Sequence, residues 1–415
     1  MKKKVFFKTF GCRTNLYDSQ VMMSSLEAYE ITQNEEEADT IVINSCTVTN
    51  GADTHVRTYI SHIEKTTGAK IFLTGCGAHT KGETLLAEKR VHGVFGQSEK
   101  QKIDFLLSQE QPFYDPGDLN HIDNLIVDDF VGKSRAFIKI QEGCNFRCSY
   151  CIIPFVRGDA RSMHEEKILE QISRLALNGF GEFILTGTNV GSYGVGAGTS
   201  IAKLMKKMSQ IRGVRRIRLG SVEPIQITDE FKELLDEPWL ERHLHIALQH
   251  TSPTMLKLMN RRNVYKQDRE LFEHLASKGF AIGTDFITGH PGETQALWDE
   301  AMQNVEALPL THLHAFSYSK RDGTPSATMK PEVNGKVAKE RLHQLEATIE
   351  EKNLHFRKAN HKPLEVLVES VKDGMYQGFD QFFNKIIIES NEDLVGDWIN
   401  IENFEAQKEY NYVRI

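Results

Sequence analysis

Short apolar segments and amphipathic segments alternate along the first 110 or so residues of the chain. Strands of a parallel sheet are buried on both faces and therefore show as continuous apolar runs. Such runs predict strands at residues 5–10, 40–44, 70–74 and 91–96, and helical periodicity follows them at residues 18–29, 52–65, 80–89 and 99–107. Strands that alternate with helices predict a parallel sheet. We therefore expect residues 1–112 to form an α/β domain.

A linker and a second series of strands are expected next. Residues 111–133 contain Pro112, Pro116, Gly117 and several aspartates, a composition that favours irregular structure. Beyond them the alternation predicts six βα units, two fewer than a closed eight-stranded barrel has. We expect residues 130–357 to form an open (β/α)6 partial barrel that ends in a long helix over 336–360. Its expected strands are 136–141, 182–186, 216–220, 243–249, 281–288 and 312–317.

Residues 358–415 change to short strand patterns separated by turns. Strands are expected at 364–371, 383–390, 397–402 and 410–415. Several short strands in close succession predict a small all-β barrel. The fold class that the sequence predicts is therefore α/β, with a small β domain at the C-terminal end.

Composition excludes several classes of protein. The formal net charge of -7 over 415 residues means that any surface for nucleic acid must be local. No window approaches the roughly 20 apolar residues of a membrane span, and the first residues resemble a strand rather than a signal peptide. Six cysteines in a chain of this length do not suggest a disulfide framework. We therefore expect a cytoplasmic protein with no membrane partner.

Three of the six cysteines are clustered. Cys144, Cys148 and Cys151 have the spacing C-x3-C-x2-C. Three thiolates in one loop can hold three irons of a [4Fe-4S] cube and leave the fourth iron open for a ligand. A zinc site short of one ligand is the alternative, since structural zinc sites normally have four.

The other three cysteines are far apart in the sequence, but each follows a predicted strand. Cys12, Cys46 and Cys76 should therefore meet at one edge of the parallel sheet. Helix N-termini at that edge should lower the pKa of the thiols, and Gly11 and Gly75 allow close approach of the backbone. The pattern suggests a second [4Fe-4S] cube with an open iron. Three unrelated buried cysteines are the alternative.

Together, the cysteine motifs resemble those of the methylthiotransferases of the radical S-adenosylmethionine (SAM) superfamily. The motifs are TFGCRTN at residues 9–15, NSCTVT at 44–49, TGC at 74–76, and the triplet followed by IIPFVRG at 152–158. Tyr150, just before the third clustered cysteine, also fits. The resemblance implies an N-terminal three-cysteine domain, a radical SAM core and a C-terminal TRAM domain. Arg13 and the run RGDARS at 157–162 resemble the branch that acts on N6-threonylcarbamoyladenosine in tRNA. The branch that acts on isopentenyladenosine typically has glutamine in place of Arg13.

The resemblance also implies a reaction and its partners. The cube at Cys144, Cys148 and Cys151 would chelate SAM and cleave it to a radical that activates the adenine C2–H. The cube at the dispersed cysteines would present sulfur, which a second SAM methylates. The implied partners are the anticodon stem-loop of a tRNA and an electron donor such as flavodoxin or ferredoxin. Methylthiolation of a ribosomal protein side chain, methylthiolation of isopentenyladenosine and a two-cluster electron carrier are the alternatives.

Residues after other barrel strands are candidates for the SAM pocket. Gly187 and Thr188 follow the second strand, and Ser221 and Glu223 follow the third. Each could instead be an ordinary cap or turn residue. Asp285 and His290 on or after the fifth strand are weaker candidates, and a structural role is favoured for His290. We assign no catalytic residue beyond the cysteines.

Two charge patterns bear on RNA binding. A basic run could form a phosphate-binding patch, although a solvated helix face is the alternative. The C-terminal segment has six Lys/Arg against eleven Asp/Glu, which is unusual for a module expected to bind RNA. The basic run is Lys203, Lys206, Lys207, Arg212, Arg215, Arg216 and Arg218.

Overall fold

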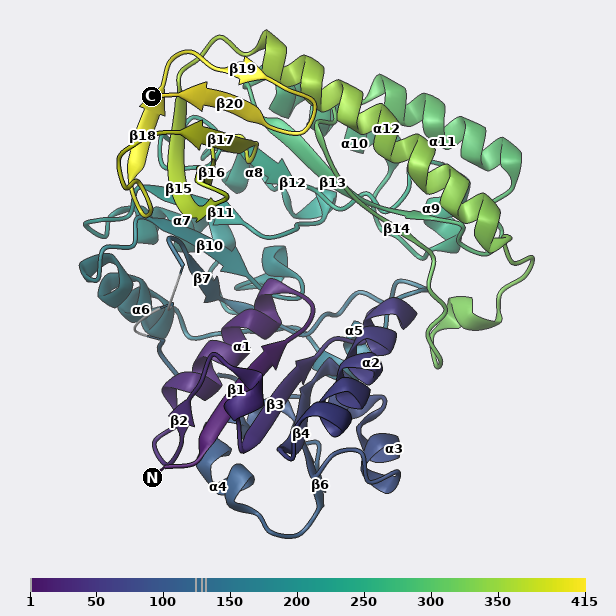
Figure 1. The fold of residues 1–415 in the computed structure, drawn as a ribbon. Coiled ribbons are helices and arrows are strands. Elements are labelled where there is room, and N and C mark those ends of the chain that lie inside the picture. Colours follow the sequence, from purple (N-terminus) through teal and green to yellow (C-terminus); the bar gives the residue numbers. More distant parts are fainter. Residues whose placement is uncertain (1, 124, 128–129, 131–132) are drawn as a thin grey trace.

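The computed structural model describes residues 2–123, 125–127, 130 and 133–415. Its N-terminal part, at the bottom of Figure 1, is a parallel sheet, as the sequence predicted. The six strands lie in the spatial order β2 (Glu30–Ile31), β1 (Lys4–Thr9), β3 (Thr40–Ser45), β4 (Lys70–Gly75), β5 (Gly93–Phe95) and β6 (Phe113–Asp115).

Helices cover both faces of this sheet. Successive side chains of a strand point to opposite faces. Ile41 and Ile43 accordingly pack with α2 (Asn50–Thr66) and α3 (Gly82–Ala87), while Val42 packs with α1 (Arg13–Ser24) and α4 (Ile103–Ser108). The result is a doubly wound α/β domain.

One expectation for this region was wrong. The segment 111–133, expected to be a linker, contains β6, which pairs in parallel with β5. The sheet therefore extends beyond the expected boundary at 112. With only three residues and a proline on either side, β6 carries too short a pattern for a strand to be recognised.

The central part is an open barrel of six parallel strands. In order they are β7 (Ala136–Lys139), β10 (Glu182–Thr186), β11 (Arg216–Leu219), β12 (His243–His245), β13 (Ala281–Thr288) and β14 (His312–Ser317). Parallel bridges Ile217–Leu240 and Val222–Ile246 join β11 to β12. Within the described residues no ladder joins β7 to β14, so the barrel is open there, as predicted.

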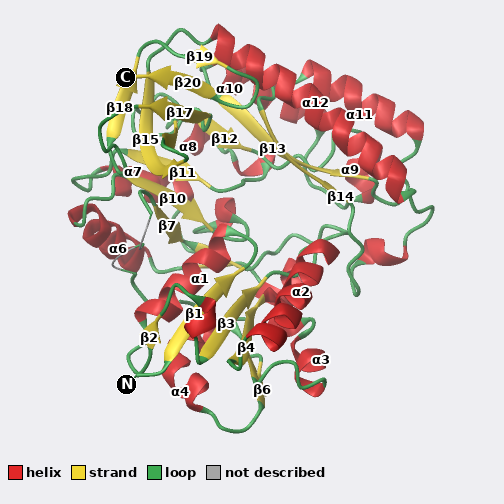
Figure 2. Ribbon diagram, in the orientation of Figure 1, coloured by secondary structure: helices red, strands yellow, loops and turns green. Residues whose placement is uncertain are grey.

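Besides α5 (Ile153–Arg157), seven α-helices in the described part of the chain alternate with these strands or follow them, and Figure 2 shows α6, α11 and α12 on the outer side of the strands. The last is the predicted long helix, which lies across the top of the view. They are α6 (Glu165–Leu177), α7 (Ile201–Ser209), α8 (Asp229–Lys232), α9 (Pro253–Leu258), α10 (Tyr265–Ser277), α11 (Gln295–Ala307) and α12 (Gly335–Ala359).

The C-terminal part is the small all-β domain that the sequence predicted, in the form of a curled mixed sheet or half-barrel. Its edge strands β18 and β19 are not joined by a ladder in the described part of the chain. β17 and β20 pair in parallel, and the other pairs are antiparallel. The spatial order is β18 (Trp398–Ile401), β15 (Leu364–Lys372), β16 (Met375–Phe379), β17 (Lys385–Glu389), β20 (Asn411–Arg414) and β19 (Glu405–Ala406).

Acidic residues of this sheet dock it onto the barrel. Glu365 pairs with Arg216 of β11 at 2.7 Å, and Glu369 pairs with Arg135 just before β7. Arg215 and Arg216 lie over the ring of Trp398. Part of the acidic composition therefore serves an internal interface. Among the described residues no helix is long and apolar enough to cross a membrane.

Candidate active site

The three dispersed cysteines lie at one edge of the N-terminal sheet. Cys12 follows β1 and caps the N-terminus of α1, Cys46 follows β3, and Cys76 begins the 3-10 helix η2 (Cys76–His79) after β4. From β1 the chain turns outward to β2, whereas from β3 it turns the other way to β4. This edge therefore holds a crevice at a topological switch point, the usual ligand site of open α/β sheets.

Glycines bring the cysteine loops together. Gly11 has φ +94°, and a Cβ added to it would lie 2.5 Å from the Cβ of Cys46. Gly75 has φ +85°, and its added Cβ would lie 2.4 Å from the carbonyl oxygen of Ser45. A side chain at either position is excluded by both backbone conformation and space. The close approach expected from the sequence is therefore present.

Burial controls the acidity of these thiols. It raises the pKa of Cys46 to about 12, and the nearby Cys76 and Cys12 contribute to the shift. Burial also raises the pKa of Cys76, although Arg157 opposes it. The expected lowering by helix N-termini was wrong for these two, because burial is the larger effect. A bound metal would be needed to ionise them at neutral pH.

The clustered cysteines form a loop between β8 (Gln141–Glu142) and α5 (Ile153–Arg157). Nitrogen donors surround their sulfurs. Asn189 donates to Cys144 Sγ at 3.5 Å, and Arg261 donates to Cys148 Sγ at 3.6 Å. Burial raises the pKa of Cys151 to about 12. Donors of this kind stabilise sulfur that carries negative charge in a metal site.

The geometry suits clusters better than single ions. Among the described residues no three His, Cys, Asp or Glu side chains could hold one metal ion together. A [4Fe-4S] cube does not require this, because each thiolate binds its own iron. Either set of three thiols could therefore hold a cube, whereas neither provides the ligand set that the zinc alternative needs.

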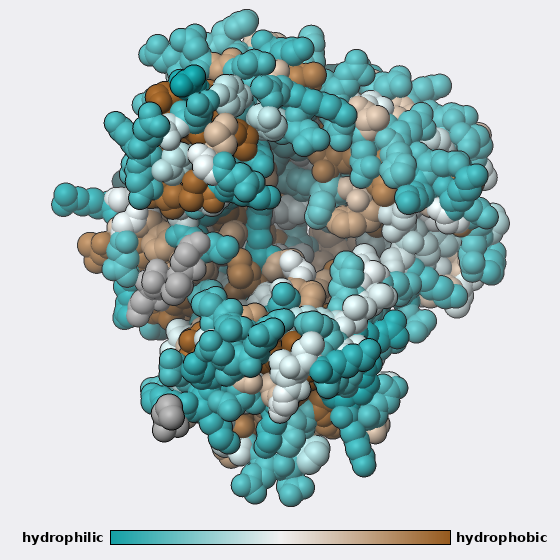
Figure 3. Space-filling model, in the orientation of Figure 1, coloured by the Kyte–Doolittle hydropathy of each residue, from teal (hydrophilic) through white to brown (hydrophobic). Residues whose placement is uncertain are grey.

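A cavity lined by members of both cysteine sets adjoins a second, larger cavity. One, of about 400 Å³, is lined by Cys12, Cys46, Cys76 and Cys151. The other, of about 550 Å³, extends from Cys12 along the barrel strands to the C-terminal sheet. Both share Cys12, Thr14, Gly187, Asp285 and His314. Figure 3 shows the hollow between the lower, N-terminal part of the molecule and its upper part.

The residues expected to shape a SAM pocket divide into two groups. Gly187 packs against the cysteine loop, because an added Cβ would lie 2.6 Å from the Gln141 carbonyl oxygen. Thr188 donates to the Gly143 carbonyl at 2.7 Å. Both line the cavity that contains Cys151. Ser221 lines the larger cavity and donates to Asp285 at 2.8 Å.

Glu223 and His290 have protein partners. Arg261 forms a two-pronged ion pair with Glu223 and also reaches Cys148, so Arg261 joins this carboxylate to the cysteine loop. No motif in the sequence had indicated Arg261. His290 is fully buried, with Ser149 at 3.1 Å from Nε2 and the Pro291 carbonyl at 2.9 Å from Nδ1, which fits the structural role favoured for it.

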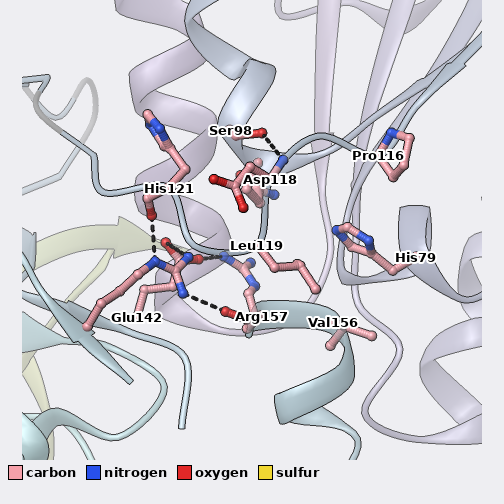
Figure 4. A pocket seen from close by; sticks show the side chains of 11 residues that line it. His79, Ser98, Pro116, Asp118, Leu119, His121, Glu142, Val156 and Arg157 are labelled. Carbon is pink, nitrogen blue, oxygen red and sulfur yellow. Dashed lines mark hydrogen bonds and ion pairs between the residues drawn. The ribbon is translucent and has the colours of Figure 1, made fainter. Parts of the chain in front are cut away.

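A buried network of charges lies beneath the two cysteine loops. Lys139 of β7 contacts Asp18 of α1 at 2.6 Å and Glu142 at 3.1 Å. Arg157 pairs with Asp18 at 2.9 Å and with Glu142, and its Nε lies 3.2 Å from Cys76 Sγ. Figure 4 shows Arg157 and Glu142 meeting beside a cavity of about 10 Å³, large enough for about one water.

Two further residues complete this network. Lys100, at 2.9 Å from Asp18 and 2.6 Å from Asp123, is fully buried. Among the described residues, the buried members are thus three acids and three bases from the N-terminal domain, the barrel and the segment between them, and Arg161 joins them at Glu142. Sequence reasoning missed it, although a lysine within the apolar strand around Lys139 was a signal.

The basic run does not form one surface. Arg216 and Arg218 are buried in β11 and bonded to Glu182, at 2.9 and 2.7 Å. They are therefore not part of an exposed basic face. Lys206 and Lys207 are exposed on α7, where each has a glutamate partner, as on an ordinary solvated helix face.

Comparison with known proteins gives consistent matches. Residues 4–96 match a family described as "Uncharacterized protein family UPF0004", and residues 138–305 match the radical SAM superfamily. A Helicobacter pylori protein with a provisional methylthiotransferase name is 52% identical, with 99% of each chain covered. The threonylcarbamoyladenosine tRNA methylthiotransferase MtaB of Bacillus subtilis is 33% identical over 99% of this chain and 96% of its own.

The chain belongs to the radical SAM methylthiotransferases. It is thus an enzyme of a family that inserts sulfur and transfers a methyl group, and its family implies SAM and a [4Fe-4S] cluster as cofactors. A solved structure supports the fold of this methylthiotransferase. The radical SAM methyltransferase TsrM of Kitasatospora setae superimposes with a TM-score of 0.61 at 16% identity, covering 79% of this chain and 77% of that one.

Proposed function

We propose that this methylthiotransferase acts on N6-threonylcarbamoyladenosine next to a tRNA anticodon and adds a methylthio group at C2. The observation that carries the proposal is that one cavity is lined by Cys12, Cys46 and Cys76 and also by Cys151 of the clustered set. A base placed there faces both chemical centres. The names of MtaB relatives from Bacillus subtilis and Aquifex aeolicus support threonylcarbamoyladenosine, although relatives named tRNA-2-methylthio-N(6)-dimethylallyladenosine synthase are similarly distant.

Each cysteine set has a role in this proposal. Cys144, Cys148 and Cys151 hold the cube that chelates SAM, and Cys12, Cys46 and Cys76 hold a second cube. With both cubes and SAM bound, the cofactors supply the radical and the sulfur. The protein positions the base and excludes water around it.

Other residues support the SAM site. We assign the SAM pocket to the loops of Gly187 and Thr188, with Ser221 and Glu223 nearby, because these loops abut the clustered cysteines. We propose three domains, residues 1–112, 130–357 and 358–415, with β6 at residues 113–115 extending the sheet of the first. A flavodoxin or ferredoxin supplies the electron, and we expect the enzyme in the cytoplasm, where its tRNA substrate is.

Nucleoside analysis tests this proposal. Transfer RNA from a deletion strain should lack the methylthio form of N6-threonylcarbamoyladenosine in mass spectrometry, and the unmodified precursor should accumulate. Loss of methylthiolated isopentenyladenosine instead would point to the other tRNA branch. A changed ribosomal protein digest with unchanged tRNA would overturn the proposal.

The two cysteine sets can be tested separately. Replacing Cys12, Cys46 and Cys76 by alanine should preserve cleavage of SAM to 5′-deoxyadenosine but abolish the methylthio product. Replacing the clustered set should abolish both. Circular dichroism should first confirm that each variant is folded. Methylthio product from the first variant would show that the dispersed cysteines do not deliver sulfur.

A further inference from the structure

Arg13 lies next to Cys12 at the mouth of the larger cavity. Its guanidinium has no ion pair or hydrogen bond with any described residue, and it lies over the Phe383 ring, 5.7 Å from the centroid. Burial lowers the pKa of this guanidinium and Arg135 lowers it further, while the more distant charge of Glu241 opposes them. A cation that is largely removed from water and lacks a hydrogen-bonded carboxylate is costly to maintain in a folded protein.

The other arginines around Phe383 do have partners. Arg135 and Arg218 lie over the same ring, at 5.7 and 5.2 Å. Arg135 pairs with Glu369, and Arg218 pairs with Glu182 and Glu241. The acids lining the cavity are also satisfied. Glu241 accepts from Arg218, while Asp285 is held by His245 at 3.1 Å and by Ser221. Arg13 is therefore the cation of this group left for a ligand.

Phe383 is held in place to face Arg13. Its φ of +64° is strained for an aromatic residue. The carboxylate of Asp380 accepts from the backbone N–H of Phe382 and of Asn384 and fixes the turn. The ring stacks on His243 at 5.3 Å and on Phe379 at 4.9 Å. Strain that the surrounding structure maintains is typical of functional sites.

A second polar group of the cavity also lacks a partner. His243 is 5% exposed, lines the cavity, and its Nε2 has no hydrogen bond. Burial, followed by the neighbouring His312, lowers the pKa of His243 well below its ordinary value. The cavity thus offers a cation that has no hydrogen-bonded partner, Arg13, beside the aromatic ring of Phe383.

We propose that Arg13 binds the carboxylate of an N6-substituted adenosine and so selects an anionic substituent over a neutral one. This inference rests on the proposed function. The C2–H and the N6 group lie on the same edge of adenine, so a base whose C2 faces Cys12 directs its N6 substituent at the adjacent Arg13. The guanidinium can bind a carboxylate through two parallel hydrogen bonds. An apolar substituent would leave the cation unpaired, which disfavours it.

The test compares two anticodon stem-loop RNAs on the reconstituted enzyme. One carries N6-threonylcarbamoyladenosine, and the other carries its threonine carboxylate capped as an amide. Fluorescence anisotropy measures binding, and product formation gives KM and kcat. The wild type should bind the carboxylate RNA about 10- to 100-fold more tightly, the range expected for a charged hydrogen bond. Arg13→Gln should remove this difference, and Arg13→Lys should restore part of it.

Controls separate this role from a structural one. Arg57→Gln removes one exposed charge from α2 of the same domain and should keep the wild-type preference. Iron content establishes that Arg13→Gln retains its clusters. If Arg13→Gln loses its clusters, the role of Arg13 is still tested by the comparison of the two RNAs on the wild type and on Arg13→Lys.

The outcomes are distinct. Equal wild-type affinity for both RNAs would overturn the role of Arg13, as would an equal loss for both RNAs in Arg13→Gln. In either case, formation of the methylthio product from the carboxylate RNA would still support the proposed function. No methylthio product from either RNA with active wild-type enzyme would overturn the proposed function and this inference with it.

Discussion

The Nε of Arg157 lies 3.2 Å from the Sγ of Cys76. Arg157 ends the helix that follows the clustered cysteines, and Cys76 belongs to the N-terminal sheet. One fully buried side chain thus connects the loops that hold the two cysteine sets. Arg157 also bonds Asn15, three residues after Cys12, so its position is fixed from both sides.

The first prediction concerns this contact. Arg157→Lys keeps the charge but loses the planar group that reaches Cys76. Hydrogen bonds to cluster sulfurs stabilise the more negative, reduced form and so help to set the potential. We expect the reduction potential of the Cys76 cluster to fall in an EPR-monitored redox titration. The control is Arg147→Lys, because Arg147 forms an exposed ion pair with Asp159. An unchanged potential in Arg157→Lys would contradict a role for this contact.

The second prediction concerns Gly11. Alanine there would place its Cβ 2.5 Å from Cys46 and force a positive φ on a residue with a side chain. Two cubes correspond to about eight irons per chain, and Gly11→Ala should retain about four. Gly68→Ala is the matched control, since nothing lies within 4 Å of its added Cβ. Iron analysis and the visible absorption spectrum give the answer, and full iron content in Gly11→Ala would argue against a cube at this edge.

The third prediction concerns the clustered cysteines. Replacing Cys144, Cys148 and Cys151 by alanine should also leave about four irons per chain, because the two cysteine sets bind separate cubes. The remaining cube should not shift its EPR signal when SAM is added, since the SAM-chelating iron has been removed. An unchanged iron count in this variant would be incompatible with two clusters.

The fourth prediction concerns the buried charges. Asp123→Asn leaves Lys100 and Lys139 without one of their carboxylates. Breaking a buried ion pair costs about 3–5 kcal/mol, so the melting temperature of the cluster-free protein should fall at pH 7. As a control, replacing Glu273, the exposed partner of Arg269, should change the free energy of unfolding by less than about 1 kcal/mol.

The pH dependence of this difference has a definite sign. Burial alone would raise the pKa of Asp123, but Lys100 and Lys139 outweigh it and lower the pKa from 3.8 to about 2. A carboxyl whose pKa is lower in the folded state adds stability above the unfolded-state pKa and loses it as the pH falls toward the folded-state value. The difference in the free energy of unfolding between wild type and Asp123→Asn should therefore stay constant from pH 7 to about 4 and become smaller below. A difference that grows in acid would exclude this network as its cause.

The sequence predicted the framework of the fold because local signals were sufficient there. The strands before Cys12, Cys46 and Cys76 are continuous apolar runs, and their parallel pairing brings the following residues to one edge. Strands β2 and β6 were missed because two or three residues carry no usable period.

Long-range partners were beyond the reach of the sequence. Arg216 and Arg218 resembled a surface patch until Glu182 and Glu365, distant in the chain, proved to be their partners. Arg261 similarly gave no hint of its bond to Glu223. Whether a charged residue lies on the surface or is buried can be decided only when the partners that compensate its burial are known.

Helix α1 packs on the N-terminal sheet with one side and on the barrel with another. Its Tyr17 and Val21 are fully buried in the hydrophobic core of the barrel, and Asp18 between them joins the buried charges around Lys139. A fragment that starts after residue 112 would leave this part of the barrel uncovered. The N-terminal domain and the barrel therefore cannot be exchanged between relatives as independent units. A productive chimera would have to carry α1 together with the strand β7 that it covers.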